Sequence, residues 1–291
     1  MRSTKVLFLA AITAGATIGG TVATTARAAL LAADRFDYAP GSNNGNGTAT
    51  AGWAGSWGGG TVVAGSLTYS DGTNSVPQAG DATNRVFNGN GRWGRTLDTT
   101  AGGTFGSAGL VSGGYVGADN TTLYLGVLMK FDSVSSFASL ELHRDVSGDG
   151  SRVVDFGRGE GYQDASTLAA FNPNGSNGDV KTFGQSDVAT HLYVLRIDFK
   201  TGNDVISLYR DPVDLSVEPA TPIATVSSRD VAFNRVSFGN FGNAGLSADE
   251  LRIGTSFADV TAVAPVPEPA SLGVAATLAA ATLLRRRRTN S

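Results

Sequence analysis

Cysteine is absent from the 291-residue chain, and other residue types that carry chemistry are scarce. Without cysteine there is no disulfide, no thiolate metal ligand and no thiol nucleophile. The only two histidines, His143 and His191, lie in neither a metal-ligand spacing nor a nucleophile motif. No G-x-x-x-x-G-K-[ST] phosphate-binding motif occurs either. Thiol chemistry is therefore excluded, and nucleotide binding lacks support.

Positive charge is scarce once the two ends of the chain are set aside. The whole chain has 22 basic and 25 acidic residues. The first 28 residues hold three of the basic ones, and four arginines and Glu268 lie near the C-terminus. Residues 29–265 therefore have 15 basic and 24 acidic residues, a net charge of −9. An acidic surface repels phosphate backbones, so we expect no nucleic-acid partner.

Between the two ends, no stretch has the sustained 3.6-residue apolar period of a helix. The two ends themselves are expected to be targeting segments. At the N-terminus, Arg2 and Lys5 give a basic start, and residues 6–25 are apolar and small. Ala26 and Ala28 then fit the A-x-A cleavage pattern of a secretory signal peptide. We predict a signal peptide at residues 1–28 and export of the remaining chain.

The C-terminal end combines a proline break, an apolar run and a basic stop. The two prolines cannot continue a strand and mark the end of the folded domain. The apolar run 270–284 has about 15 residues, fewer than the roughly 20 that an untilted membrane helix needs. The arginines stay on the cytoplasmic side by the positive-inside rule. The residues of the break and the stop are Val266, Pro267, Glu268, Pro269, Arg285, Arg286, Arg287 and Arg288.

In motif, spacing and arginine cluster, this end resembles the PEP-CTERM sorting signal of Gram-negative-type bacteria. The resemblance implies cutting by an exosortase-type membrane enzyme and release to the cell surface or to an extracellular polysaccharide matrix. It divides the end into a linker with the Pro-Glu-Pro motif at 262–269 and a short transmembrane helix with an arginine-rich tail at 270–291. A plain C-terminal membrane anchor is the alternative.

Residues 29–261 are predicted to form one all-β domain, since about 235 residues between the targeting ends suit a single large β domain. The clearest strand is 123–131, where apolar residues alternate over nine positions. Residues 191–210 read as a hairpin with a Gly-containing turn, and 164–171 is the one predicted helical turn. Shorter strands are predicted at 34–38, 61–69, 85–87, 93–97, 137–144, 152–156, 231–238 and 250–253.

Many short strands separated by Gly, Asn and Pro indicate a two-sheet antiparallel sandwich or a barrel. The order of features is similar to that of the concanavalin A-like (laminin G/glucanase-type) jelly roll. That resemblance implies that the first and last strands are neighbours, which would let Asp34 or Asp37 pair with Arg252. The features that carry it are 34–38, Trp53 with Trp57, 123–131, 191–210 and 249–254.

Catalytic carboxylates are hard to find in this domain. Glycoside hydrolases need two carboxylates on one face, about 5–5.5 Å apart for a retaining mechanism. None of the four glutamates in residues 29–261 has an acidic residue two positions away. Glu141, followed by His143, is the best acid/base candidate, but we expect a solvated pair on an exposed face. We predict that the protein is not an enzyme.

The sequence contains two candidate binding sites. Asp145, Ser147 and Asp149 resemble the first half of a calcium loop, although the glutamate expected at its twelfth position is absent; the alternative is a simple Asp/Gly turn. No other cofactor is expected.

Aromatic rings bind sugars by stacking, and the three tryptophans lie in Gly-rich segments where a ring could be exposed. The alternative is that they pack at the edge of the sandwich. The tryptophans are Trp53, Trp57 and Trp93.

Together these patterns predict an exported, non-catalytic protein of the cell envelope, outer surface or extracellular matrix of a Gram-negative-type bacterium, with a structural or carbohydrate-binding role. Its expected partners are an exosortase-type enzyme, the membrane through the tail before processing, and a polysaccharide. The alternatives are a glycoside hydrolase or lyase with an unusual site, and an adhesin that binds protein.

Overall fold

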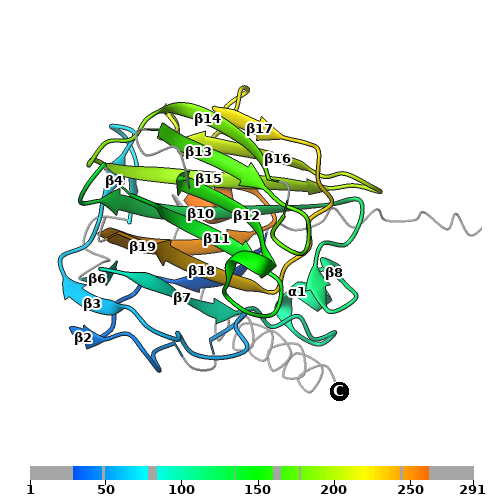
Figure 1. Cartoon of the computed structure of the whole chain (residues 1–291), viewed down its shortest axis with the longest axis horizontal. Helices are drawn as coiled ribbons and strands as arrows, with labels where there is room; N and C mark the ends of the chain where they lie inside the picture. Colours follow the sequence, from blue (N-terminus) through cyan, green and yellow to red (C-terminus); the bar gives the residue numbers. More distant parts are fainter. Residues whose placement is uncertain are drawn as a thin grey trace, which may run out of the picture.

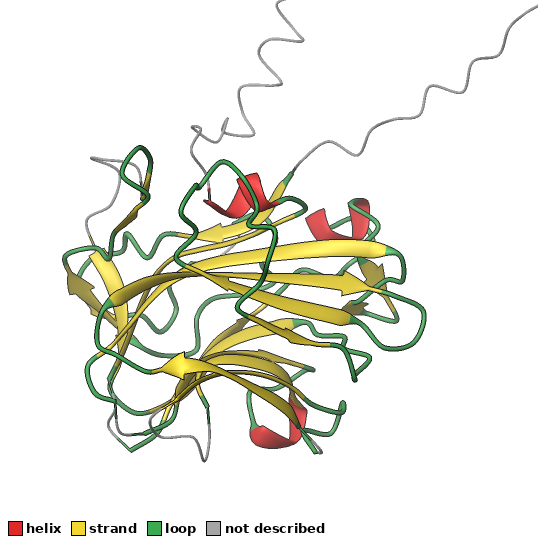
Figure 2. Cartoon of the chain, turned by 90° about the horizontal axis from the view of Figure 1, so that it is seen from above, coloured by secondary structure: helices red, strands yellow, loops and turns green. Residues whose placement is uncertain are grey.

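The computed structural model shows a nearly all-β body of stacked antiparallel sheets, consistent with a jelly-roll sandwich (Figures 1 and 2). Both predicted targeting ends, together with the predicted cleavage and sorting residues, lie outside the described residues. Across the described ranges, no helix combines the length and the apolar character needed to span a membrane. The structure describes residues 29–47, 50–77, 84–134, 136–159, 165–176, 178–242 and 245–261.

The larger sheet has nine strands in the described chain, all paired antiparallel. The predicted hairpin is confirmed as β15 and β16, and the predicted strand 123–131 lies within β10. In spatial order the strands are β17 (Ala224–Val226), β16 (Val205–Arg210), β15 (Thr190–Phe199), β10 (Thr121–Phe131), β19 (Leu246–Gly254), β6 (Asn84–Asn88), β3 (Thr61–Ala64) and β2 (Gly41–Ser42), with β1 (Leu30–Asp34) also on β19.

The smaller sheet has six strands in the described chain and lies in front in Figure 1. Its order is β14 (Asp179–Gln185), β13 (Ala165–Ala170), β12 (Arg152–Arg158), β11 (Ala138–His143), β18 (Arg235–Asn240) and β7 (Gly91–Thr96). The remaining elements are β4 (Tyr69–Ser70), β5 (Ser75–Val76), α1 (Thr104–Ser107), β8 (Val111–Ser112), β9 (Tyr115–Val116), the 3-10 turn η1 (Asp149–Ser151) and α2 (Phe257–Thr261).

The main core lies between the two sheets. Successive side chains of a strand point to opposite faces, so Leu125 and Val127 of β10 meet Leu140 and Leu142 of β11 in one buried cluster. A second buried cluster covers the outer face of the nine-stranded sheet and includes Leu128. The six-stranded sheet is different. Its inward-facing side chains are apolar, but the side chains on its outer face are mostly charged or polar.

The first and last strands are neighbours, as predicted: β1 pairs with β19, and Ala33 lies opposite Arg252. The expected side-chain pair is wrong, however. Asp34 receives a hydrogen bond from Arg95 at 2.8 Å inside the sandwich, and Arg252 binds Glu250 at 2.7 Å. The strand predicted at 34–38 is displaced toward the N-terminus, because β1 spans Leu30–Asp34.

Two local predictions are also corrected. Phe36 has φ of 54°, a left-handed conformation that interrupts a strand, so the first strand stops before it. The helical turn predicted at 164–171 is strand β13 from Ala165 to Ala170. Its residues alternate between the two faces, with Leu168 and Ala170 in the core cluster and Thr167 and Ala169 on the outer side, which is the period of a strand.

Candidate functional site

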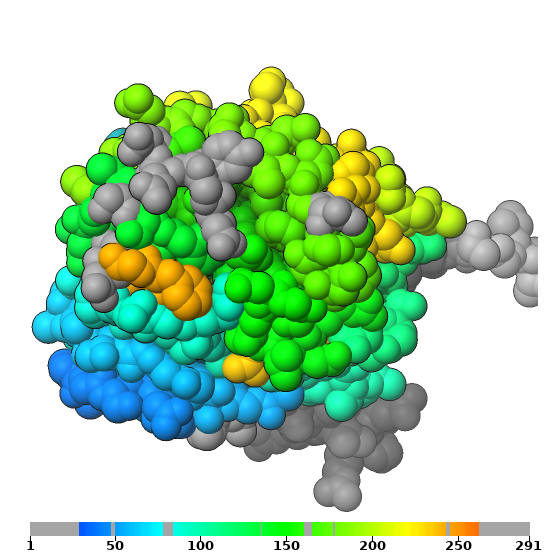
Figure 3. Space-filling view, viewed as in Figure 1, coloured from blue at the N-terminus to red at the C-terminus, as the bar shows by residue number. Residues whose placement is uncertain are grey.

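The candidate site lies on the outer face of the six-stranded sheet, which Figure 3 shows from the same side as Figure 1. Glu141 of β11 lies opposite Asp155 of β12 and Ser237 of β18. Residues directly opposite on antiparallel strands share a face, so two carboxylates and a hydroxyl are brought side by side. The neighbouring edge strand β7 adds Arg92, whose register partner is Gly239.

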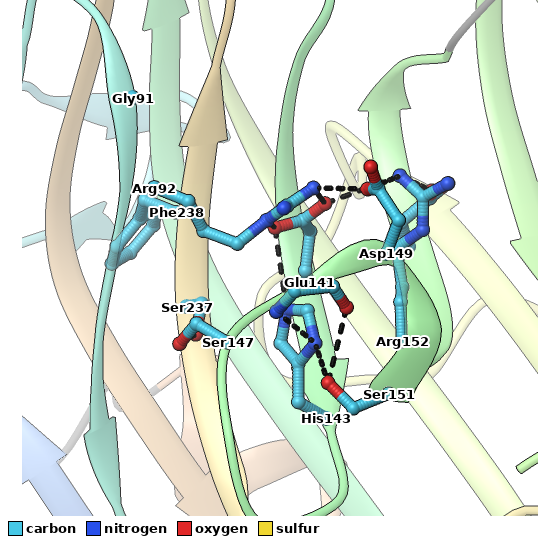
Figure 4. A network of polar contacts seen from close by, with 12 residues as sticks. Gly91, Arg92, Glu141, His143, Ser147, Asp149, Ser151, Arg152, Ser237 and Phe238 are labelled. Atoms are coloured by element: carbon cyan, nitrogen blue, oxygen red, sulfur yellow. Dashed lines mark hydrogen bonds and ion pairs between the residues drawn. The ribbon is translucent and has the colours of Figure 1, made fainter. Parts of the chain in front are cut away.

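Glu141 is the centre of a polar network (Figure 4). Arg92 donates to it through Nε and through Nη2, the latter at 2.9 Å. Arg152 donates from Nη1 at 3.2 Å, and His143 Nε2 lies 3.3 Å from the carboxylate. Asp149 also accepts from Arg92 at 2.7 Å. One carboxylate is therefore held by two guanidinium groups and an imidazole.

The expectation of a solvated Glu141–His143 pair is wrong. Both residues are fully buried, with 0% exposure. The segment that follows β11 folds back over the sheet, and η1 brings Asp149 onto Arg92 (Figure 4). The outward direction of Glu141 was predicted from strand alternation, but its covering loop was not.

Burial alone would raise the pKa of Glu141. Hydrogen bonds from His143 and Arg92, together with the positive charge of Arg92, outweigh that effect and hold the pKa below its ordinary value. The carboxylate is therefore ionised at neutral pH. A general acid needs the opposite shift, so Glu141 is poorly suited to protonate a leaving group.

Ser151, His143 and Glu141 have the residue types of a nucleophilic triad. His143 Nδ1 lies 3.3 Å from Ser151 Oγ, and its Nε2 lies 3.3 Å from Glu141. The serine hydroxyl, however, donates to the Val146 carbonyl, and Gly148 N–H points at His143 Nδ1 at 3.4 Å. A ring nitrogen that accepts from a backbone amide is not free to take the serine proton. The arrangement fastens the 145–151 loop to the sheet.

Three phenylalanine rings and two arginines form a strip beside this network. The Arg92 guanidinium lies 5.1 Å from the centre of the Phe241 ring, and Phe241 lies 5.8 Å from Phe137. Arg152 lies 5.4 Å from Phe137 and 4.6 Å from Phe171. Phe241 is 41% exposed. We call Phe241, Arg92, Phe137, Arg152 and Phe171 the Phe–Arg strip.

The three predicted calcium ligands have separate partners. Asp145 accepts from Tyr115 Oη at 3.0 Å and from the Asn234 amide at 3.1 Å. Ser147 accepts from Arg235 at 2.6 Å. Asp149 binds Arg92, as described above.

The structure therefore corrects the calcium prediction. The three side chains are directed to different neighbours, and two of those neighbours are guanidinium groups that would repel a cation. Within the described part of the chain, no group of three or more His, Asp or Glu side chains is arranged to hold a metal ion.

The predicted sugar-stacking role of the tryptophans is also wrong. Trp53, Trp57 and Trp93 are 4%, 0% and 5% exposed. Trp57 lies 5.8 Å from Trp53 and 5.0 Å from Trp93, measured between ring centres, and its indole N–H donates to Asp34 at 2.7 Å. All three rings belong to the main core cluster, so they pack inside the sandwich and are not exposed in loops.

The residues missed from the sequence are Arg92, Asp155 and the three phenylalanines. The sequence does indicate the direction of Asp155. It lies between the apolar residues Val154 and Phe156, which point inward, on a strand that follows the Glu141 strand after a tight turn. Pairing those two strands places both carboxylates on one face. Arg92 and Phe241 come from distant segments, and only the full strand order brings them together.

No protein-family model matches the chain, and no curated protein sequence matches it either. Among solved structures, it is similar to a glycosyl hydrolase family protein from Mycobacterium fortuitum, with a TM-score of 0.35 and 14% identity over 77% of this chain and 99% of the other. It is also similar to the galectin LEC-6 of Caenorhabditis elegans, with a TM-score of 0.31 and 11% identity over 48% of this chain and 88% of the other.

A third similar structure is a binding domain of botulinum neurotoxin DC in complex with SialylT. Its TM-score is 0.36 and its identity 10%, over 69% of this chain and 44% of that one. At these identities and TM-scores, the three likenesses carry no argument about function.

Proposed function

We propose that this protein is an exported, non-catalytic protein that binds polysaccharide at the outer surface or in the extracellular matrix of a Gram-negative-type bacterium. In this proposal an exosortase-type enzyme processes its PEP-CTERM end, and its body is a concanavalin A-like jelly roll. The binding face is the outer face of the six-stranded sheet.

The observation that carries the binding proposal is the Phe–Arg strip. Sugar rings have an apolar face that stacks on aromatic rings and hydroxyls that bind charged side chains. The strip offers both within one surface, since Phe241 is 41% exposed and Arg92 lies against it at 5.1 Å. The guanidinium groups are already paired with Glu141, which keeps them in fixed positions.

Two observations support a non-catalytic role. Glu141 is buried between two arginines, and its pKa is lowered, so it has no proton to donate near neutral pH. The Ser151 hydroxyl donates to a loop carbonyl, and His143 Nδ1 faces the Gly148 N–H at 3.4 Å. Export is supported by the sequence of the two ends alone.

A glycoside hydrolase or lyase is the second candidate, because Glu141 and Asp155 lie opposite each other on adjacent strands. Their separation is bridged by Arg152, whose Nη1 lies 3.2 Å from each carboxylate. Release of reducing ends from a matrix polysaccharide that the protein binds would establish this activity. Its absence, with binding retained, supports the non-catalytic role.

The test of binding compares two variants on a polysaccharide array. Phe241→Ala should weaken polysaccharide binding roughly fivefold to tenfold, equivalent to about 1–1.4 kcal/mol. Val213→Ala is the matched control, since Val213 is 90% exposed and lies after β16 of the other sheet. Equal binding by both variants, or binding to protein ligands only, would overturn the proposal in favour of an adhesin or another role.

The sorting proposal has its own test. Deletion of residues 266–291 should remove the protein from the cell surface and the matrix, as measured by immunoblotting of cell fractions. Replacement of the four arginines by serine should give the same mislocalisation with the folded body intact. Unchanged surface localisation in both strains would contradict the sorting role.

A further inference from the structure

A cavity of about 250 Å³ opens next to the Phe–Arg strip, over β12, β13 and β14. Arg152 and Phe171 belong to both features, so the cavity continues the strip across the sheet. Pockets for drug-sized ligands begin at about 300 Å³, which makes this one suitable for a single small ring. The side chains that line the cavity are Arg152, Asp155, Thr167, Ala169, Phe171 and Val180.

The cavity depends on two glycines in its wall. A Cβ atom on Gly159 would lie 2.0 Å from Thr167 Oγ1, and one on Gly178 would lie 2.5 Å from the Phe171 ring. Real Cβ atoms are not found at such distances, so any other residue at these positions would displace the Thr167 or Phe171 side chain. The space is therefore specified by the local sequence.

Thr167 gives an independent sign of a ligand. Its side chain lines the cavity and is 0% exposed, yet its hydroxyl has no hydrogen-bond partner in the described structure. A buried hydroxyl without a partner costs about 1–3 kcal/mol, and protein interiors rarely keep one without a reason. A bound molecule with a hydroxyl group would satisfy it.

The walls of the cavity divide into two kinds. Ala169, Phe171 and Val180 supply an apolar side, while Thr167 and Asp155 supply hydroxyl and carboxylate oxygens. A pyranose ring has the same division, with C–H groups on its faces and hydroxyls on its rim. Water would form hydrogen bonds only with the polar side, and its release from the apolar side would favour binding of the ring.

The charges around the cavity disfavour an anion. Arg152 is the cation nearest to it, and its Nη1 lies 3.2 Å from Glu141 and from Asp155 and 4.0 Å from Asp149. Arg92 binds Glu141 and Asp149 as well. Among the described residues of this network, two guanidinium groups thus face three carboxylates, and this excess of carboxylates disfavours a uronate or a sulfated sugar.

We propose that this cavity is a binding pocket for one uncharged sugar ring of a polysaccharide, and that it makes the binding face prefer neutral polysaccharides over uronate-containing ones. The proposal rests on the proposed function and deepens it. The Phe–Arg strip holds the chain of the polysaccharide, and the cavity selects one ring of it by its size, its hydroxyls and its lack of charge.

The test measures binding of the protein purified from its cells to dextran, galactan and mannan as neutral probes and to alginate and polygalacturonate as uronate probes. The wild type should bind at least one neutral probe at least tenfold more tightly than either uronate probe. Ala169→Leu, which fills the cavity from its floor, should weaken that binding about tenfold. Thr225→Leu on β17, an exposed position of the other sheet, is the matched control and should bind as the wild type does.

Thr167→Val separates loss of binding from loss of folding, because it removes only the unpartnered hydroxyl. It should leave the melting temperature unchanged or higher, and it should weaken the binding of the neutral probe at least threefold. Wild-type affinity in both cavity variants, or a preference for a uronate probe, would overturn this inference. The proposed function would still stand in that case if Phe241→Ala loses binding. A wild type that binds none of the probes would overturn the proposed function together with the inference.

Discussion

The outer faces of the two sheets are closed in different ways. On the nine-stranded sheet, Leu128 of β10 and Leu192 of β15 are fully buried in an apolar cluster under Leu215 and Phe257. On the six-stranded sheet, the equivalent position is occupied by Glu141, which is just as buried but is held by charged partners. One sheet face is covered by hydrophobic contact and the other by ion pairs and hydrogen bonds.

This difference separates two roles. Hydrophobic burial stabilises by removing apolar area from water and depends little on pH or salt. A buried ion-pair network contributes less net stability, because desolvation offsets its attraction, but loss of one partner is costly. The outer face of the nine-stranded sheet is therefore stabilised by apolar burial, whereas the outer face of the six-stranded sheet holds a fixed polar network.

The largest expected effect comes from Glu141→Gln. It leaves Arg92 and Arg152 without their shared carboxylate, and we expect a loss of about 3–5 kcal/mol in the free energy of unfolding at pH 7. The folded pKa of Glu141 is lowered, so its contribution is present above the unfolded pKa of about 4.3 and is lost as pH falls through the folded value. Urea unfolding of wild type and variant at pH 7 and pH 3 should show the difference shrink in acid. If the variant loses the same free energy of unfolding at both pH values, the ionised Glu141 network does not stabilise this face of the sheet.

The next effect is Leu128→Ala on the opposite sheet. The deleted side chain is 0% exposed, so the loss should be about 3 kcal/mol. Because no charge is involved, this loss should be the same at pH 7 and pH 3 in the same urea experiment. Val213→Ala, at 90% exposure, should change the free energy by less than about 0.5 kcal/mol. A pH-dependent loss for Leu128→Ala would show that the two faces are not distinct.

A smaller effect is expected at His191, which starts β15. Its Nδ1 lies 2.5 Å from Asp211 and its Nε2 2.8 Å from Asp187. The hydrogen bond to Asp211 raises the pKa of His191, burial opposes the rise, and Asp187 adds to it. The stabilisation is therefore present below the unfolded pKa of about 6.5 and is lost as pH rises through the folded value. His191→Gln should cost roughly 1.5 kcal/mol at pH 6 and less at pH 9. An unchanged cost at pH 9 would contradict the assignment.

The smallest effect concerns calcium. Asp145, Ser147 and Asp149 have separate protein partners, so millimolar calcium chloride should leave the melting temperature unchanged. Magnesium chloride at the same ionic strength is the control. A rise in melting temperature with calcium alone would show that the loop rearranges around the ion and would reopen the calcium site.

Much of the fold could be predicted from local pattern. Strand β10 was clear because its apolar residues alternate, and the β15–β16 hairpin was clear because a Gly-containing turn separates two apolar runs. Strand β13 was missed, because an Ala- and Leu-containing segment without aromatic residues has no strong strand propensity. Its extended form is imposed by pairing with β12 and β14.

The candidate site was harder to predict, since it depends on which strands become neighbours. Glu141 was selected and its outward direction was correct, but Arg92 reaches it only through the order β11, β18, β7. The tryptophans were placed wrongly for a related reason. Their Gly-rich surroundings indicate loops, but a glycine also lets two backbones approach closely, and a Cβ on Gly60 would lie 3.0 Å from the Trp93 ring.

The place of β19 has a consequence for the biogenesis of the protein. This strand is the last one along the described chain, yet it lies in the interior of its sheet, with β10 on one side and β6 and β1 on the other. Until residue 254 has emerged, β10 and β6 have no strand between them and the sheet is in two halves. The sandwich therefore cannot form progressively from its N-terminus, and a chain that emerges in that direction completes its larger sheet only after β19 has arrived.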